Sequence, residues 1–319
     1  MKSSTSCRQV RPAPATAARR RRGVTLVEVL VVVALVFLVV ALAVPELRAA
    51  QIRARRATCA QNLRHLGLAL HNYHAANECF PMSAVAGGKG HGVGQSDLTI
   101  ILPYIELSPV YNTYNFSLEN WHVANSTTVL TRITTYLCPA NPGKLDPVPA
   151  AEVLTPEGPA YPPSRSVFAR SHYGANWGGG HPGTGDDFVK SEKTYRGVMM
   201  TVVDEKNKDR SRVISFADIP DGTVNTLSMA EKLDSQGWGV GGWGGSEFDV
   251  AESPNYEGQD DKARRAFSGS AHPGGLNVLF CDGSARFLTA STDRKVWYAL
   301  ITRDGAEIIK EADRGGAPQ

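Results

Sequence analysis

The first clear pattern in the chain is a long apolar run near the N-terminus. Sixteen consecutive apolar residues, Val29 to Val44, follow the segment Val24-Thr25-Leu26-Val27-Glu28. A helix rises about 1.5 Å per residue, and the hydrocarbon core of a bilayer is about 30 Å thick. The 21 residues from 24 to 44 are therefore enough to cross it. We predict a membrane-spanning helix over residues 24–44.

Beyond Pro45 the pattern changes from uniformly apolar to amphipathic. Apolar residues recur at intervals of four, three, four and three positions, at Cys59, Leu63, Leu66, Leu70 and Tyr73. This spacing draws one stripe along a helix. We expect one helix over residues 24–76, with its second half packed against a sheet. Three histidines on this segment lack the spacing of a zinc motif and are interpreted as a solvated polar face: His65, His71 and His74.

Residues 77–312 are predicted to form an exported head rich in β-structure. Four segments are expected to be strands or buried apolar stretches: 98–106, 133–137, 198–203 and 213–217. Asp282-Gly283 separates the β-type runs 276–281 and 284–288, and Asp-Gly in this setting is the strongest short hairpin signal. The last residues, 313–319, are expected to be a disordered tail.

Charge sharpens the interpretation of the N-terminus. The whole chain has 34 Lys and Arg against 31 Asp and Glu, and seven of the basic residues lie in residues 1–23, which contain no acidic residue. Basic residues before an apolar span predict a cytoplasmic N-terminus and an exported remainder. The remainder has 27 basic and 31 acidic residues. It shows no basic patch interleaved with aromatics, so we expect no nucleic-acid partner.

Two ordinary explanations of the N-terminus fit poorly. A cleaved signal peptide needs a shorter apolar region followed by a small-residue cleavage site, whereas this run ends at Pro45-Glu46. A plain transmembrane anchor leaves Glu28 unexplained, because an unpartnered carboxylate in an apolar helix costs several kcal/mol.

The segment Gly23-Val24-Thr25-Leu26-Val27-Glu28 resembles the processing site of type IV pilins and type II secretion pseudopilins. The resemblance implies that a prepilin peptidase cuts after Gly23 and methylates Val24, leaving residues 1–23 as a cleaved leader. It also implies that Glu28 pairs with the Val24 amine of a neighbouring subunit, which neutralises two costly charges. Pro45 stands where pilins often have a helix-kinking proline. The leader is long for the best-known pilins.

Further blocks extend the resemblance along the chain. They are Arg56-Ala-Thr-Cys59-Ala-Gln-Asn62 through His74, Tyr136-Leu-Cys138-Pro139, Asp221-Gly222-Thr223-Val-Asn225-Thr-Leu227 with Glu231, and His272 through Asp282-Gly283. They resemble a large bacterial family of unknown function (domain of unknown function 1559), whose members have a prepilin-type segment and a C-terminal His-x9-Asp-Gly motif.

The resemblance implies a pilin-like α+β fold, with a long helix packed on an antiparallel sheet head with long loops. It also implies a structural subunit of a type II secretion or type IV pilus-like filament in the inner membrane, whose partners are the peptidase and other pilin-like subunits. The sequence has no nucleophile elbow, P-loop or zinc-protease helix, so we expect no enzymatic activity.

The family-motif residues are weak evidence for a ligand site. A strand over 276–281 rises about 3.3 Å per residue, which keeps His272 and Asp282 apart. We interpret Asp282 as a turn residue and His272 as a loop residue whose ring bonds the backbone. Asp218, Asp221 and Glu231 are weak candidates for a structural Ca²⁺. No other metal or cofactor is expected.

The cysteines suggest disulfides in the exported head. Cys7 would leave with the leader, and four remain in an oxidising compartment: Cys59, Cys79, Cys138 and Cys281. Cys59 and Cys138 lie in family blocks, so the resemblance favours their pairing and leaves Cys79 with Cys281. Other pairings, and four reduced thiols, stay open.

One alternative function is a membrane-tethered extracytoplasmic binding protein, with glycans as the ligand. Three tryptophans in or beside Gly-rich loops would supply its stacking surface: Trp177, Trp238 and Trp243.

Overall fold

The computed structural model describes residues 23–85, 94–141, 145–155, 158–159, 165–178, 197–199, 201–202, 213–242, 245–248, 254–255 and 268–305. The predicted leader before Gly23, with Cys7, and the predicted tail 313–319 lie outside these residues. The chain falls into two compact units, Met1–Ala50 and Gln51–Gln319, which are described separately.

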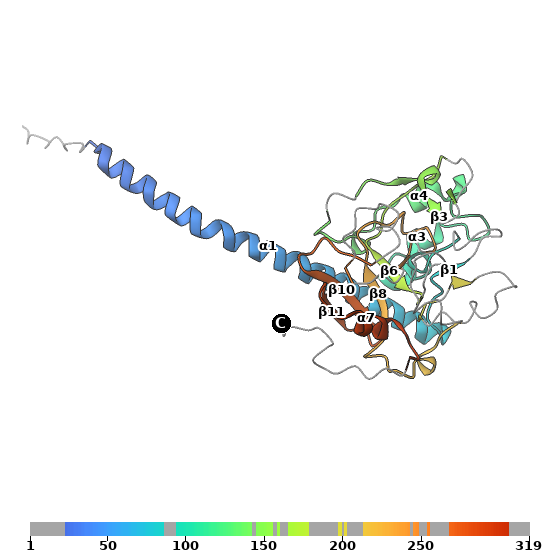
Figure 1. The fold of residues 1–319 in the computed structure, drawn as a ribbon. Helices are drawn as coiled ribbons and strands as arrows, with labels where there is room; N and C mark the ends of the chain where they lie inside the picture. Colours follow the sequence, from blue (N-terminus) through green and yellow to red (C-terminus); the bar gives the residue numbers. More distant parts are fainter. Residues whose placement is uncertain are drawn as a thin grey trace, which may run out of the picture. The chain divides into compact units, whose positions relative to one another are not determined.

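Helix α1 (Leu26–Asn77) is 52 residues long (Figure 1). Its bounds lie within two residues of the predicted helix. Pro45 lies inside it, where the missing N–H removes one helical hydrogen bond. Among the described helices, α1 has the length and apolar composition needed to cross a membrane.

In the second unit, the predicted stripe of α1 forms part of the core. Four of its five residues are buried, and Tyr73 is half-buried. The buried members are Cys59, Leu63, Leu66 and Leu70.

The head is built on a five-stranded sheet in the order β11-β10-β8-β6-β9 (Figure 1). The strands are β6 (Tyr173–Asn176), β8 (Leu227–Glu231), β9 (Glu247–Phe248), β10 (Gly275–Phe280) and β11 (Ala285–Thr289). Neighbouring strands are antiparallel except β6 and β9, which are parallel. The predicted antiparallel sheet is thus present from β11 to β6, and the parallel edge strand β9, whose two residues have no recognisable strand pattern, adds to it.

The two faces of the sheet contribute to different cores. Leu279 and Met229 share a core with the α1 stripe. Val278 and Phe280 share another with Trp297 of helix α7 (Arg294–Ile301). Side chains alternate between faces along a strand, so α1 covers one face and α7 the other. This arrangement confirms the predicted α+β, pilin-like fold.

The predicted C-terminal hairpin is present. Strands β10 and β11 pair from Gly275↔Thr289 to Leu279↔Ala285. Asp282 Oδ1 accepts hydrogen bonds from Ser284 N and Oγ at 2.8 and 2.6 Å. Gly283 has a φ of +84°, a conformation that favours glycine.

The segment 98–106 is helical rather than extended. Ser96 caps α2 (Asp97–Ile100), its Oγ accepting from Thr99 N at 3.1 Å, and Pro103 lies in the first turn of the following 3₁₀ helix η1 (Leu102–Ile105). A short apolar run cannot distinguish strand from helix by periodicity. The segments 133–137 and 213–217 likewise contain the 3₁₀ helices η3 (Thr134–Tyr136) and η6 (Phe216–Asp218), and 198–203 contains strand β7 (Thr201–Val202).

Short elements complete the described head. The helical ones are α3 (Ser108–Asn112), η2 (Val123–Asn125), α4 (Ser126–Val129) and η4 (Ala150–Glu152). The extended ones form three two-stranded pairs: β1 (Ala84–Val85) with β7, β2 (Val148–Pro149) with β5 (Val167–Phe168), and β3 (Leu154–Thr155) with β4 (Gly158–Pro159).

Candidate functional site

The start of α1 is organised by Thr25 and Glu28. The backbone N and the Oγ1 of Thr25 donate to Glu28 Oε2 at 2.8 and 3.0 Å, and Glu28 N donates to Thr25 Oγ1 at 3.3 Å. These reciprocal bonds form a capping box, in which a Thr N-cap and a Glu three positions later satisfy free donors at a helix start. Thr-x-x-Glu is a readable sequence signal for this cap, and sequence reasoning assigned Glu28 only to filament pairing.

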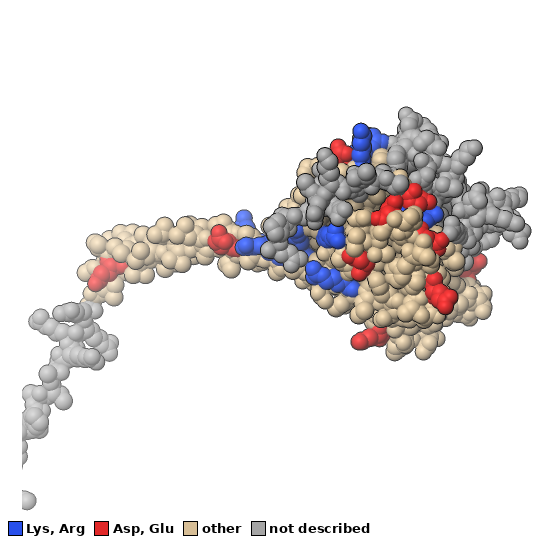
Figure 2. Space-filling view, turned by 90° about the horizontal axis from the view of Figure 1, so that it is seen from below, with Lys and Arg blue, Asp and Glu red and all other residues tan. Residues whose placement is uncertain are grey.

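The N-terminal part of α1 exposes its own apolar side chains. Gly23 and Val24 are exposed, as are the large apolar side chains from Leu26 to Leu47. In Figure 2 this stretch is tan over most of its length, with few charged side chains. Among the described residues of the first unit, no other element covers this surface.

A second site lies inside the head, where four metal-type donors converge. One side-chain donor atom of each of Cys59, Cys138, Glu231 and His272 lies within 4.8 Å of the others, and all four residues are buried. His272 Nε2 is 3.4 Å from Cys138 Sγ and 3.4 Å from Glu231 Oε1. We call this group the buried four-residue cluster.

Four separate segments supply the cluster. Cys59 belongs to the buried stripe of α1, and Glu231 is the last residue of β8. Cys138 lies two residues after η3, and His272 lies three residues before β10. The fold therefore brings the end of one strand, the beginning of another and the covering helix to one point.

Backbone and amide groups hold the cluster in place. Asn277 fixes the Glu231 carboxylate, with its backbone N donating to Oε2 at 2.8 Å and its Nδ2 donating to Oε1 at 3.0 Å. Cys138 N donates to His172 Nδ1 at 3.0 Å. Among the described residues, His272 Nδ1 has no hydrogen-bond partner. The glutamate and one thiol therefore have fixed positions, and the imidazole offers Nε2 to them.

The groups of the cluster shift one another's pKa values. The hydrogen bond from Cys138, aided by His272, lowers the pKa of Cys59 to about 7, against the opposing effect of burial. Burial alone would lower the pKa of His272, but its hydrogen bonds with Cys59 and Glu231 raise that pKa to about 9. Burial would raise the pKa of Glu231, but His272 and Asn277 outweigh it and lower that pKa. The cluster therefore favours a thiolate, a carboxylate and a cation in close contact.

The prediction that the His272 ring bonds the backbone was wrong. Its Nε2 faces side chains of the cluster rather than a backbone carbonyl. Asp282 instead bonds Ser284 in the hairpin turn, as predicted for that residue. Sequence reasoning named all four cluster residues and paired Cys59 with Cys138, but it did not place Glu231 and His272 beside them, since long-range packing decides their proximity.

The structure does not bring the three calcium candidates together. Asp218 Oδ2 accepts from Ser215 N and Oγ in the cap of η6. Asp221 Oδ2 accepts from Gly305 N at 2.7 Å, and Glu231 belongs to the cluster. In the part of the chain that the structure describes, metal-type donors gather only in the four-residue cluster, and a structural Ca²⁺ stays a prediction.

The neighbouring family-motif residues form a turn. Gly222 has a φ of +91°. Asn225 Nδ2 donates to the backbone carbonyl of Asp221 at 2.8 Å. These contacts give Asp221, Gly222 and Asn225 structural roles in the approach to β8.

All four cysteines of the head are free thiols in the structure: Cys59, Cys79, Cys138 and Cys281. Cys59 and Cys138 nevertheless lie side by side in the cluster, as their predicted pairing requires. Cys79 is half-buried and Cys281 is buried. Neither predicted bond is formed in the structure, and both stay predictions for the exported protein.

Two of the helix histidines do not form a solvated face. His71 Nε2 lies 3.0 Å from the backbone carbonyl of Cys281. The His74 ring packs at a tilt against Phe216 with centroids 4.0 Å apart, and its Nε2 accepts a hydrogen bond from Phe216 N at 3.2 Å. His65 is exposed as predicted and contacts Gln61. The interpretation was wrong for His71 and His74 because the segments around Phe216 and the hairpin pack against this end of α1.

The tryptophans proposed for glycan stacking are not on the surface. Trp238 is fully buried, and its Nε1 donates to Thr131 O at 2.9 Å. Trp177 is also buried, and Trp243 lies outside the described residues. For Trp177 and Trp238 the stacking hypothesis was wrong, because both rings pack within the fold.

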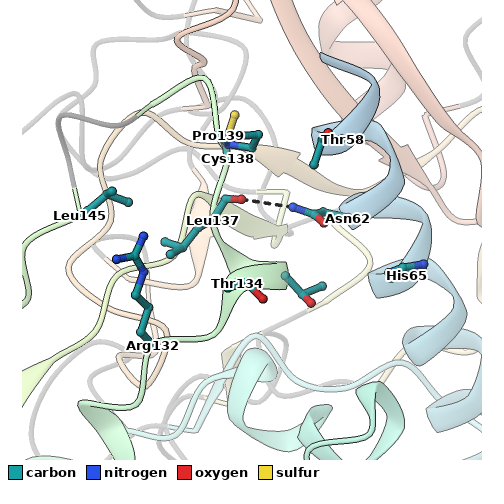
Figure 3. A pocket seen from close by; sticks show the side chains of 10 residues that line it. Thr58, Asn62, His65, Arg132, Thr134, Leu137, Cys138, Pro139 and Leu145 are labelled. Carbon is teal, nitrogen blue, oxygen red and sulfur yellow. Dashed lines mark hydrogen bonds between the residues drawn. The ribbon is translucent and has the colours of Figure 1, made fainter. Parts of the chain in front are cut away.

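A pocket of about 510 Å³ lies beside the cluster, between α1 and the segment that follows α4. Cys138 lines it together with Thr58, Asn62, His65 and Arg132. Figure 3 shows Cys138 among the lining side chains, and the hydrogen bond that Asn62 Nδ2 of α1 donates to Leu137 O on the opposite wall. One cluster member therefore borders an open space.

Comparisons with known proteins give two family matches. Residues 48–295 match the model described as "Protein of unknown function (DUF1559)". Residues 18–44 match the prokaryotic N-terminal methylation motif. No curated protein and no solved structure matches the chain significantly.

Proposed function

The chain belongs to the DUF1559 family and contains a prokaryotic N-terminal methylation motif, and from this premise we propose that it is a structural subunit of an envelope filament. In this proposal it is a pseudopilin or pilin-like protein of a type II secretion or type IV pilus-like system. A prepilin peptidase removes residues 1–23 and methylates Val24. The observation that supports the proposal most is the methylation motif on a helix whose apolar surface is uncovered.

The distribution of exposed apolar side chains supports assembly through the helix. Large exposed apolar residues are continuous from Leu26 to Leu47. In the described part of the second unit they are scattered: Ile52, Leu68, Phe116, Val123, Leu130, Val213 and Val224. Scattered apolar side chains are normal on a surface, whereas a continuous apolar surface requires a membrane or a partner. In this proposal the inner membrane covers it first, and neighbouring helices cover it in the filament.

Glu28 favours the transfer of this helix from the membrane to a neighbouring subunit. In the single chain its carboxylate is held by Thr25. Cleavage after Gly23 creates a charged amine at Val24, and a carboxylate buried in an apolar setting is far more stable with a cationic partner. In the filament, Glu28 pairs with the Val24 amine of the next subunit, which sets the stagger between helices.

The head has the complementary role in this proposal. Its sheet is covered by α1 on one face and α7 on the other, so it needs no partner to complete its core. We propose that it lies in the periplasm or at the cell surface and supplies lateral contacts, with no catalytic activity. The cytoplasmic placement of the N-terminus rests on the basic residues of the leader.

Two substitutions at one position separate charge pairing from helix capping. Gln replaces Glu in a capping box, so Glu28→Gln retains the cap and loses the charge, whereas Glu28→Val loses both. We expect both variants to insert into the membrane and both to fail in filament assembly, measured by sedimentation of sheared filaments and by cross-linking between subunits. Glu46→Gln, on the same helix, is the control and should assemble normally. Normal assembly of Glu28→Gln would show that only the cap matters and would refute the charge pairing.

A further inference from the structure

We propose that Cys59, Cys138, Glu231 and His272 form a structural binding site for one Zn²⁺ ion. Zinc favours thiolate sulfur, imidazole nitrogen and carboxylate oxygen in a tetrahedral arrangement. The cluster presents two sulfurs, one nitrogen and one oxygen within 4.8 Å of one another. The inference is independent of the filament proposal, because it concerns the interior of the head.

The spacing of the donors agrees with a tetrahedral ion. Zinc lies about 2.3 Å from sulfur and about 2.0–2.2 Å from nitrogen or oxygen. Tetrahedral angles then separate sulfur from nitrogen by about 3.6 Å, and nitrogen from oxygen by about 3.3 Å. The observed separations are 3.4 Å between Cys138 Sγ and His272 Nε2, and 3.4 Å between His272 Nε2 and Glu231 Oε1. For these two pairs of donors the separations already suit an ion, and the Cys59 sulfur lies within 4.8 Å of the other donors.

The surroundings match those of a metal ligand set. The carboxylate of Glu231 is fixed by two hydrogen bonds from Asn277, and ligating carboxylates are characteristically held by such outer partners. Two thiolates and a carboxylate exceed the charge of Zn²⁺ by one. The guanidinium of Arg56, which lies over the Phe287 ring, is near enough to Glu231 for their charges to interact.

The burial of the cluster indicates a structural rather than a catalytic ion. All four ligands are buried, and structural zinc sites are closed whereas catalytic sites keep an open position. The ion would join α1, the segment after η3, the end of β8 and the segment before β10. It would thus attach the long helix to the sheet that it covers. Through Cys138 the site borders the pocket beside α1.

A disulfide between Cys59 and Cys138 is the competing state of the same sulfurs. It would use two of the four donors and would leave the imidazole of His272 paired only with the carboxylate of Glu231. Metal and disulfide exclude each other here, because each requires both sulfurs, so one experiment distinguishes them.

The test uses the full chain, purified in detergent from membranes without added reductant. We expect metal analysis to find one Zn²⁺ per chain and mass spectrometry to find Cys59 and Cys138 unlinked. After removal of zinc under reducing conditions, added Co²⁺ should produce tetrahedral d–d bands and a thiolate-to-cobalt charge-transfer band. A Cys59–Cys138 disulfide in the protein as isolated would overturn the inference.

Variants assign the cobalt signal to the cluster. Cys138→Ser should lose the charge-transfer intensity that two thiolates give. Cys79→Ser, outside the cluster, should retain it. Asn277→Ala tests positioning and should weaken Co²⁺ and Zn²⁺ binding by about 10- to 100-fold, with an unchanged near-UV circular dichroism spectrum of the metal-loaded chain. If the reduced wild-type chain shows no charge-transfer band, or if Cys138→Ser binds as the wild type does, the site is wrong.

Discussion

Gly67 places α1 against the C-terminal hairpin. A Cβ atom at this position would lie 2.9 Å from Leu279 Cδ1, 3.3 Å from Gly283 Cα and 3.4 Å from Gly283 O. The helix therefore approaches both a core side chain and the main chain of the hairpin turn. We predict that Gly67→Ala destabilises the head, although alanine is the better helix former.

Two opposing effects set the magnitude of this prediction. Replacing Gly by Ala inside a helix gains about 1 kcal/mol, and forcing a methyl group into a packed core costs about 1–3 kcal/mol. Leu279 is fully buried in the same core, so it has little room to move away. We expect a net loss of about 1 kcal/mol in the free energy of unfolding, which lowers the Tm by about 2–4 °C in a domain of this size.

The measurement is a thermal scan of the full chain in detergent, followed by near-UV circular dichroism of the head. Asn72→Ala is the matched control, because Asn72 is exposed on the same helix and alanine there gains helix propensity without a clash. Its Tm should stay the same or rise slightly. If Gly67→Ala raises the Tm as the control does, the close packing of helix and hairpin is wrong.

Two further substitutions probe the interior of the head. Trp238→Phe removes the donor to Thr131 O and should cost about 1–3 kcal/mol of stability; a thermal scan equal to that of the wild type would place the ring in solvent instead. Burial raises the pKa of Asp97 well above its usual range. The pKa of Asp97 in the folded chain therefore exceeds its unfolded value of about 3.9. The folded chain binds the proton more tightly than the unfolded chain, so the free energy of unfolding falls as the pH rises above about 3.9. Asp97→Asn should raise the Tm at pH 8 relative to wild type and reduce the decline between pH 5 and pH 8; an equal decline in both proteins would show that Asp97 does not cause it.

Patterns confined to one segment were predictable from the sequence. The 4-3-4-3 stripe from Cys59 to Tyr73 identified the side of α1 that enters the core, and Asp282-Gly283 identified the hairpin turn. Each signal is local, because the periodicity of a helix or the conformation of a turn acts on neighbouring residues. The capping box of Thr25 and Glu28 is equally local and was readable in principle.

Features that depend on packing between distant segments were not predictable in this way. The buried cluster joins residues from α1, β8 and two connecting segments, and no spacing in the sequence relates them. The burial of Trp238 likewise depends on its contact with Thr131, which lies far away in the chain. The helical character of residues 97–105 depended on the Ser96 cap, which an apolar run alone does not reveal.

Processing of this prepilin-like chain into a filament subunit is measurable by intact-mass and peptide mass spectrometry of its N-terminus. The protein should be isolated from cells that contain a prepilin peptidase. We expect a mature chain that begins at Val24 with one methyl group on its amine. An intact Met1, or a cleavage between residues 43 and 50, would contradict it.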